Sequence, residues 1–315
     1  MAGDFGRSVR RRRMNLKGRC KLINGQKVTI GILTTPQKDI FHSNYHIGLL
    51  SGIMPRIKSL GCRLRIVMMP ARPYGKLADI LTRHKVDGMM ILTWRWIHPA
   101  LAKLVEEGED SRILVVNDPL PRLGVNCLYT DTDRGVKLAV KRLVKKGVRK
   151  IGMIHGPIDV KFRIGGKNRT LPFIDSRLKK AAFIKALQAE KIPLKRSWIR
   201  STSANSKKEG YRLAVKWFFE KQIPRAIVCG NDDLAFGVLE AMKVSGFRCP
   251  EDVAVIGFDD NPKAAGCKPP LTTIRQPLRL MGKEAVDILY REITRPRRKA
   301  VLRKYTPVLV VRRSS

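Results

Sequence analysis

Short apolar, β-branched runs alternate with longer amphipathic segments along most of the chain. The runs lie at residues 28–33, 64–69, 88–92, 113–116, 151–154, 226–228 and 253–256. The segments between them have helical length; in residues 134–146, Val136, Val140 and Leu143 share one face. Repeated strand–helix units favour parallel sheets with helices on both faces and right-handed crossovers. The series divides into two similar halves, so the pattern predicts an α/β protein with two lobes.

Polar side chains follow two of these runs directly. Residues 226–230 precede Asn231, and residues 253–258 precede Asp259. Small ligands bind outside the carboxyl ends of strands in open α/β sheets, so this pattern predicts a site for a polyhydroxylated molecule. Asn231 has an alternative role as a helix N-cap. Asp259 has an alternative role as a turn residue, and we expect Asp260 to have a structural role.

Residues 226–278 resemble the sensor domain of the LacI/GalR family of bacterial transcription regulators. The matching residues are Asn231–Asp232, Gly257–Phe258–Asp259–Asp260 and the run PPLTTIRQ at 269–276. Residues 131–144, 150–157 and 305–315 also resemble the family, and the resemblance extends over roughly residues 27–315.

The resemblance implies two Rossmann-like lobes of the periplasmic-binding-protein type I architecture, joined by three crossovers. We place the N-lobe at about residues 27–156 and 278–293, and the C-lobe at about 157–275 and 304–315.

Two segments fall outside the alternating pattern. Residues 1–26 are polar and rich in Gly and Arg, which predicts a disordered basic arm with weak phosphate contacts from Arg10, Arg11, Arg12 and Arg13. Family members usually begin with a helix-turn-helix headpiece and a hinge helix. The arm shows neither pattern, so we expect the headpiece to be missing through truncation or a late start. Residues 158–173 replace a shorter family connection and are expected to form a surface loop near the cleft mouth.

Further candidate ligand contacts come from the resemblance. Residues 175–187 align with a family helix that presents arginine to the ligand. Lys179 holds the position of that arginine here, and Arg177 lies two residues before it. Lysine lacks the planar two-pronged contact of arginine, so an anionic ligand becomes an alternative to a neutral sugar. Both cations have an alternative role on an exposed helix face. Trp94 follows a strand and is a candidate aromatic platform, with packing as its alternative.

The N-lobe contributes a second group of candidates. Ser43, Asn44 and Tyr45 open the first helix, where relatives line the cleft. Asp131 and Asp133 precede residues 134–146; we expect capping from Asp131 and ligand contact from Asp133. His42 and His46 have no evident third ligand, so no metal site is predicted.

The charge balance is the extreme feature of the composition. The 315 residues include 64 Lys and Arg against 26 Asp and Glu, a net charge of +38. Such a surface attracts polyanions, nucleic acid above all, although a merely solvated face is the alternative. The six cysteines are scattered, and no apolar run approaches the roughly 18 residues that a membrane helix needs.

We therefore expect a cytoplasmic transcription regulator that binds a sugar-like effector between its lobes, acts on DNA and forms a homodimer through N-lobe helices. No membrane partner, cofactor or enzymatic activity is expected, because the chain carries no nucleophile elbow, phosphate loop or metalloprotease pair. The alternative is a solute-binding protein of the same fold without DNA-binding activity.

Overall fold

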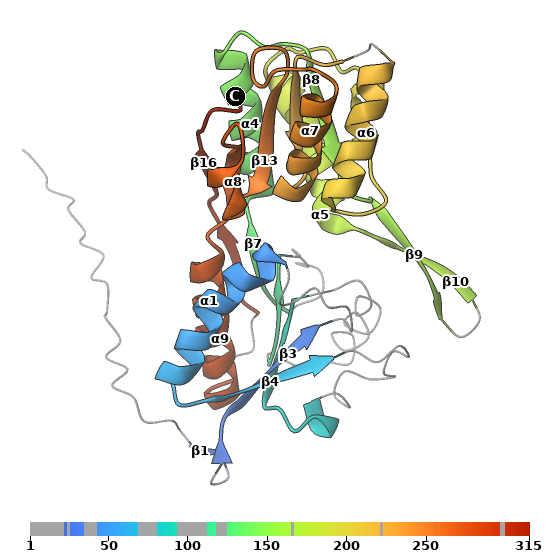
Figure 1. The fold of residues 1–315 in the computed structure, drawn as a ribbon. Coiled ribbons are helices and arrows are strands. Elements are labelled where there is room, and N and C mark those ends of the chain that lie inside the picture. Colours follow the sequence, from blue (N-terminus) through green and yellow to red (C-terminus); the bar gives the residue numbers. More distant parts are fainter. Residues whose placement is uncertain are drawn as a thin grey trace, which may run out of the picture.

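Two lobes, each built on a six-stranded sheet, are joined by a narrow waist (Figure 1). The computed structural model describes residues 22–23, 26–34, 43–68, 81–92, 112–117, 125–164, 167–220, 223–296 and 300–315. At the start of this part, β1 (Leu22–Ile23) and β2 (Gln26–Lys27) form a small antiparallel pair. The two-lobed α/β architecture predicted from the alternating pattern is confirmed.

The N-lobe sheet is parallel throughout, with the order β15-β7-β6-β5-β3-β4. Its strands are β3 (Thr29–Thr34), β4 (Arg63–Met68), β5 (Gly88–Ile91), β6 (Ile113–Val116), β7 (Asn126–Thr130) and β15 (Leu302–Tyr305). Helices α1 (Asn44–Ser59) and α9 (Leu278–Thr294) pack on each other and bury a core with this sheet. They approach closely at Gly52, where a Cβ would lie 1.9 Å from the carbonyl oxygen of Arg279.

The C-lobe sheet has the order β11-β8-β12-β13-β14-β16, and its last strand is antiparallel. Its strands are β8 (Ile151–His155), β11 (Ile199–Ser201), β12 (Ala226–Cys229), β13 (Ala254–Asp259), β14 (Thr272–Arg275) and β16 (Val308–Val310). Helices α4 (Thr132–Lys145) and α5 (Ile174–Ala189) bury one core, and α6 (Lys207–Phe219) and α7 (Asp232–Val244) bury another. Two short helical turns, η3 (Arg196–Trp198) and α8 (Lys263–Gly266), complete the lobe.

The chain crosses between the lobes three times: after β7, after β14 and after β15. The first crossing lies at Asp131, whereas the sequence analysis predicted the boundary between the N-lobe and the C-lobe near Gly156. The reason is packing: Val136, Val140 and Leu143 of α4 share a core with Phe183 of α5, and β8 pairs with β12. The C-terminal segment also divides, because β15 joins the N-lobe sheet and β16 the C-lobe sheet.

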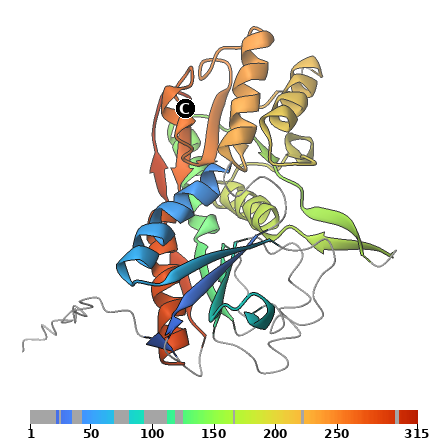
Figure 2. The same cartoon turned by 60° about the horizontal axis from the view of Figure 1, so that its bottom comes forward.

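The segment expected as a surface loop, residues 158–173, is instead an antiparallel ribbon. Strands β9 (Asp159–Ile164) and β10 (Lys167–Pro172) pair from Asp159↔Pro172 to Ile164↔Lys167. The N–H of Phe173 closes its base by donating to the carbonyl of Ile158 at 2.7 Å. The ribbon projects from the C-lobe in both Figure 1 and Figure 2. The loop interpretation was wrong because the alternation of apolar and polar residues in 160–164, which is typical of a strand, was not used.

Candidate ligand-binding site between the lobes

The polar side chains meet where the strands of both lobes end. On the C-lobe side, β8, β12 and β13 end beside the first turns of α5 and α7. On the N-lobe side, α1 begins close to the waist, and Asn117 follows β6 (Figure 1). This is the edge at which the strand-end rule places ligands in open α/β sheets.

Lys179 is the central cation of the C-lobe wall. It is 4% exposed, and its Nζ donates to Asp175 Oδ2 at 2.8 Å and to the Gly230 carbonyl at 2.9 Å. The ammonium also lies 4.2 Å from the ring centroid of Phe258. Burial alone would lower the pKa of Lys179, but the carboxylates of Asp175 and Asp259 outweigh it and raise the pKa. Lys179 therefore lies in the C-lobe wall of the candidate site, with its charge already balanced by protein carboxylates.

Asp259 ends β13 in the left-handed backbone region, with φ of 110°. Its Oδ1 accepts a hydrogen bond from Gln276 Nε2 at 2.7 Å. Burial raises the pKa of Asp259 to about 7, although the ammonium of Lys179 works in the opposite direction. A non-glycine residue in this conformation costs free energy, and such strain concentrates at binding sites.

Asn231 and Asp232 divide their roles at the end of β12. Asn231 caps α7, because its Oδ1 accepts from the N–H of Leu234 at 2.9 Å; its Nδ2 has no partner among the described residues. Asp232 is 1% exposed and accepts from the N–H of Asn261 and from Thr273 Oγ1, both at 2.6 Å. Burial, followed by the charge of Asp259, raises the pKa of Asp232 well above its usual range. Asp232 thus ties the loop after β13 to strand β14.

The floor of the C-lobe wall lies at the end of β8. His155 is 1% exposed, its Nδ1 lies 2.7 Å from the Gly156 carbonyl, and burial lowers its pKa. A Cβ on Gly156 would lie 2.1 Å from Asn205 Oδ1, so a larger residue here would require the Asn205 side chain to move.

Tyr45 is the N-lobe residue that faces this wall. Its hydroxyl oxygen is enclosed and makes no hydrogen bond within the part of the chain that the structure describes; the side chain of Asn117 lies beside it, outside hydrogen-bond geometry. Burial, followed by the charges of Asp175 and Asp259, raises the pKa of Tyr45 well above its usual range. The phenol therefore stays protonated and keeps an O–H donor, and the carboxylates of the other lobe are near enough to act on its pKa.

Ser43 and Asn44 begin α1 next to Tyr45. Ser43 is the N-cap residue of the helix, yet its side chain makes no capping hydrogen bond. Both residues are partly exposed. The structure thus brings the three predicted N-lobe residues to one helix end near the waist.

Gln276 joins the two lobes at the second crossing. Gln276 is 6% exposed. Its Oε1 accepts hydrogen bonds from two N-lobe side chains, from Asn117 Nδ2 at 3.0 Å and from Thr130 Oγ1 at 2.6 Å. Its Nε2 donates to Asp259 of the C-lobe. Sequence reasoning used Gln276 only as part of a family motif and missed Asn117. The signal for Asn117 was present, because it directly follows the strand at 113–116.

Several predicted site residues lie elsewhere. Arg177 holds the base of the ribbon: its Nε donates to the Ile158 carbonyl at 3.1 Å and its guanidinium pairs with Asp159. Asp133 is exposed in the first turn of α4 and lies 3.5 Å from Lys185 Nζ, and its ligand contact stays a prediction. Trp94 and the four arginines Arg10, Arg11, Arg12 and Arg13 lie outside the described residues.

Two structural expectations are confirmed. Asp131 caps α4, because its Oδ1 accepts from the N–H of Arg134 at 3.1 Å. Asp260 pairs with Arg312 at 2.7 Å and with Arg275 at 2.6 Å, which anchors the C-terminal strand rather than a ligand.

The site offers hydrogen-bond donors and acceptors rather than reactive groups. Asp259 and Asn231 present carboxylate and amide atoms, and Tyr45 presents a phenol. Within the described ranges, no group of three His, Cys, Asp or Glu side chains is placed to hold a metal ion, and no helix is both long and apolar enough to cross a bilayer. Polar side chains gathered between two lobes are typical of domains that recognise small molecules through hydrogen bonds.

Comparison with known proteins agrees with this class. Residues 140–315, more than half of the chain, match the family model of the periplasmic binding protein-like domain. The HTH-type transcriptional repressor PurR of Haemophilus influenzae (strain PittEE) is 29% identical over 241 residues, which cover 75% of this chain and 66% of the relative.

Solved structures show the same fold. The regulator CelR in complex with cellobiose aligns with a TM-score of 0.77 and 23% identity over 91% of this chain and 84% of that one. A dimeric Lac repressor with a C-terminal deletion aligns with a TM-score of 0.75 and 22% identity over 91% and 99%. The chain belongs to the periplasmic-binding-protein-like family, as an effector-binding domain of the LacI/GalR type.

Proposed function

We propose that this domain binds a neutral, polyhydroxylated effector between its lobes and thereby controls a transcription regulator that acts on DNA. The observation that carries the proposal is the enclosed Tyr45 hydroxyl, which lacks a partner among the described residues while facing Asp259 and Asp175 across the waist. A buried donor without a partner is costly, and a ligand hydroxyl between the two lobes would satisfy it. The named relatives are transcriptional repressors or regulators rather than enzymes.

The charges of the site favour a neutral ligand over an anionic one. Lys179 is the cation at its centre, and Asp175 and Asp259 already compensate it. Arg177, the second candidate cation, is engaged by the ribbon. A phosphate or carboxylate entering the site would meet Asp259 and Asp175 without a free cation from these two residues, whereas sugar hydroxyls pair well with carboxylate acceptors.

Gln276 supplies a route from ligand to lobe movement. It bonds Asp259 on one lobe and Asn117 on the other, so its bonds span the hinge. A ligand that bonds Asp259 competes with or reinforces the Gln276 amide, and so binds one lobe arrangement better than another. Differential affinity of this kind shifts the equilibrium between open and closed forms.

A homodimer in the cytoplasm completes the proposal. Exposed apolar side chains lie on the outer faces of α1 and α9, with Ile47, Met54 and Leu280 exposed by 46%, 53% and 46%. Large apolar side chains gathered on one exposed surface favour association. The similar Lac repressor structure is that of a dimer, which supports the same arrangement here.

Calorimetry against neutral mono- and disaccharides, beginning with cellobiose, and against their phosphate esters tests the ligand class. Asp259→Ala and Asn231→Ala should each weaken binding of the best neutral sugar by about 1–3 kcal/mol, because each removes hydrogen bonds in the site. Arg177→Ala is the matched control and should bind like the wild type. Preference for a phosphate ester, or equal losses in all three variants, would contradict the site.

Band shifts test the regulatory role separately, using DNA from upstream of the protein's own gene with and without the sugar. A sugar-dependent change in DNA affinity is expected. Sugar binding with no effect on DNA would instead support a solute-binding protein.

A further inference from the structure

The surplus of basic side chains is uneven over the C-lobe, and two helices of similar length show the difference. Helix α4 and helix α6 each carry four exposed cations. Those of α4 are Arg134, Lys137, Lys141 and Lys145; those of α6 are Lys207, Lys208, Arg212 and Lys216. The two sets match in charge but differ in their acidic neighbours.

The four cations of α4 form one line along the helix. Their spacing of three, four and four residues places them on a single face, because the helix repeats every 3.6 residues. The opposite face is buried in the core through Val136, Ala139, Val140 and Leu143. From Arg134 to Lys145 the line extends about 16 Å at a rise of 1.5 Å per residue. We call it the α4 cation line.

Carboxylates are scarce beside the α4 cation line. Within the described part of the chain, none lies within ion-pair distance of its four members. The nearest acids in sequence are engaged elsewhere: Asp131 pairs with Lys304 at 3.1 Å, and Asp133 with Lys185 at 3.5 Å. The line therefore carries four positive charges with no internal compensation.

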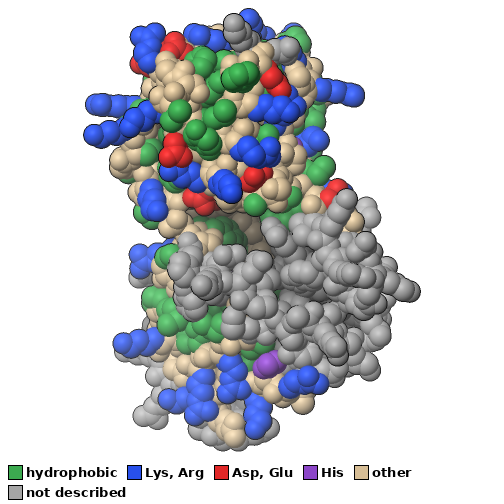
Figure 3. All heavy atoms as spheres, turned by 45° about the vertical axis from the view of Figure 1, so that its right-hand side comes forward, with side chains coloured by type: hydrophobic (Ala, Val, Ile, Leu, Met, Phe, Trp, Pro, Cys, Tyr) green, Lys and Arg blue, Asp and Glu red, His purple; other side chains and the backbone are tan. Residues whose placement is uncertain are grey.

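The surface around α6 is different. Lys207 pairs with Glu240 at 3.2 Å, Arg212 with Glu209 at 3.1 Å and Lys216 with Glu220 at 3.8 Å. Figure 3, which brings the α6 side of the molecule forward, shows acidic side chains among the basic ones on this lobe. The charge of α6 is thus largely balanced within the protein.

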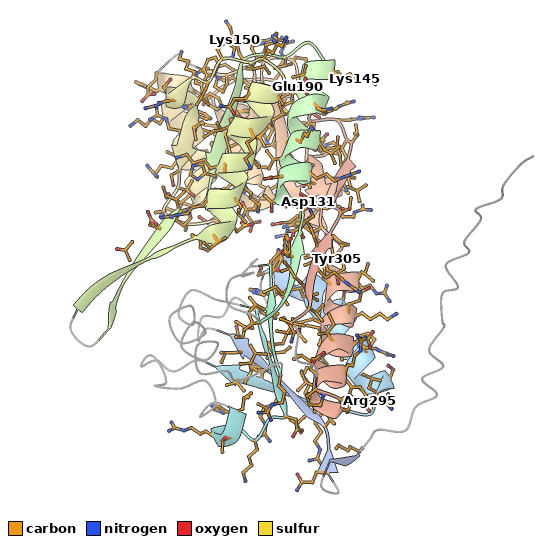
Figure 4. All side chains as sticks on the ribbon, turned by 180° about the vertical axis from the view of Figure 1, so that it is seen from behind. Asp131, Lys145, Lys150, Glu190, Arg295 and Tyr305 are labelled. Atoms are coloured by element: carbon orange, nitrogen blue, oxygen red, sulfur yellow. The ribbon has the colours of Figure 1, made fainter. Side chains whose placement is uncertain are left out.

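More cations continue the α4 line at the end of the lobe farthest from the waist. Lys146, Arg149 and Lys150 follow the helix and are exposed, and Figure 4 shows Lys145 and Lys150 at that end, opposite Asp131. Glu190 lies at the same end (Figure 4), and Arg149 donates to its carbonyl oxygen at 3.2 Å. The positive surface therefore extends over the full length of the lobe.

We propose that the α4 cation line binds the backbone phosphates of a nucleic acid, independently of the ligand site between the lobes. A straight row of uncompensated Lys and Arg on a rigid helix matches a regular row of phosphates, and such contacts give affinity without reading sequence. A membrane surface is a poorer match, because the side chains between the cations, Leu138 and Val144, are partly buried and cannot insert.

Fluorescence anisotropy with a scrambled duplex of about 30 base pairs tests the proposal on the full chain. One variant changes Arg134, Lys137, Lys141 and Lys145 to Gln; the matched control changes Lys207, Lys208, Arg212 and Lys216 to Gln. Both lose the same charge. Each phosphate contact contributes about 0.9 to the slope of log affinity against log salt, so the α4 variant should lose about 3 to 4 of that slope. Its affinity should fall at least about 10-fold at low salt, while the control changes by less than about 3-fold.

Three outcomes overturn the proposal: equal losses in both variants, an unchanged slope in the α4 variant, and no nucleic-acid binding by the wild type with retention on anionic vesicles or an acidic protein instead. A two-site variant, Lys137→Gln with Lys141→Gln, should lose about half of the slope and serves if the four-site variant does not fold. Sugar binding measured on the same variants should be unchanged, so failure here is distinct from failure of the ligand site.

Discussion

The two walls of the cleft differ in how far their polar groups are satisfied without a ligand. On the C-lobe wall, Lys179, Asp232 and Asp259 all have protein partners at 2.6–2.9 Å. On the N-lobe wall, the enclosed Tyr45 hydroxyl has none among the described residues, and Ser43 begins a helix without capping it. The C-lobe wall is therefore preorganised, whereas the proposed ligand would supply the partner that the Tyr45 hydroxyl lacks among the described residues. Substitutions should accordingly affect stability on one wall and ligand affinity on the other.

The largest effect is expected for Lys179→Met on the C-lobe wall. It removes the cation from a buried pair and leaves Asp175 without its partner, which should lower the free energy of unfolding by about 3 kcal/mol. Urea unfolding measures it. Lys185→Met, which breaks an exposed pair, is the control and should cost less than about 1 kcal/mol. Equal losses in the two variants would remove the distinction between a buried and a surface cation.

Asp259→Asn should produce the next largest effect, in the pH dependence of stability. The native pKa of about 7 exceeds the unfolded value of about 3.9, so between these pH values the native state keeps a proton that the unfolded chain has lost. The contribution of the Asp259 carboxyl to the free energy of unfolding of the wild type is therefore fully present below about pH 4, and it falls as the pH rises to about 7.

Asparagine cannot ionise, so the stability of the variant relative to the wild type should rise by about 1–3 kcal/mol between pH 4 and pH 8. Urea unfolding at a series of pH values checks the sign. A constant or falling difference would show that the Asp259 carboxyl is not destabilised by burial.

Tyr45→Phe sharpens the comparison from the N-lobe side. The substitution removes a hydroxyl that has no partner in the described structure, so the free energy of unfolding should change by less than about 0.5 kcal/mol. Affinity for the sugar identified by calorimetry should nevertheless fall by about 1–2 kcal/mol. A loss of stability comparable to that of Lys179→Met would mean that the hydroxyl is already engaged without ligand.

Arg177→Ala should have the smallest effect. Arg177 holds the ribbon base through an exposed pair and one carbonyl, so we expect at most about 1 kcal/mol of stability and no change in sugar affinity. Limited proteolysis within residues 159–172 should increase as the base loosens. A tenfold loss of sugar affinity would instead show that Arg177 contributes to ligand binding.

Local sequence pattern determined the elements and part of the site. The apolar runs predicted β8, β12 and β13, the helical period predicted α4, and the strand-end rule selected Asn231 and Asp259. The predicted elements are confirmed because periodicity depends on neighbours only a few residues away, whereas ligand contact by Asn231 and Asp259 stays a prediction. The same local view took residues 158–173 for a loop, although Val160, Phe162 and Ile164 alternate as in a strand.

Tertiary structure alone decided which groups meet. Tyr45 lies more than 100 residues before Asp175 and Asp259, and no local pattern indicates that its hydroxyl faces them. Lys179 had the appearance of an exposed helix cation, but Asp175 and the Gly230 carbonyl compensate its burial. The sequence analysis assigned α4 to the N-lobe, because an amphipathic helix specifies only that one face is buried. The core that α4 shares with α5 and the C-lobe sheet places it in the C-lobe instead.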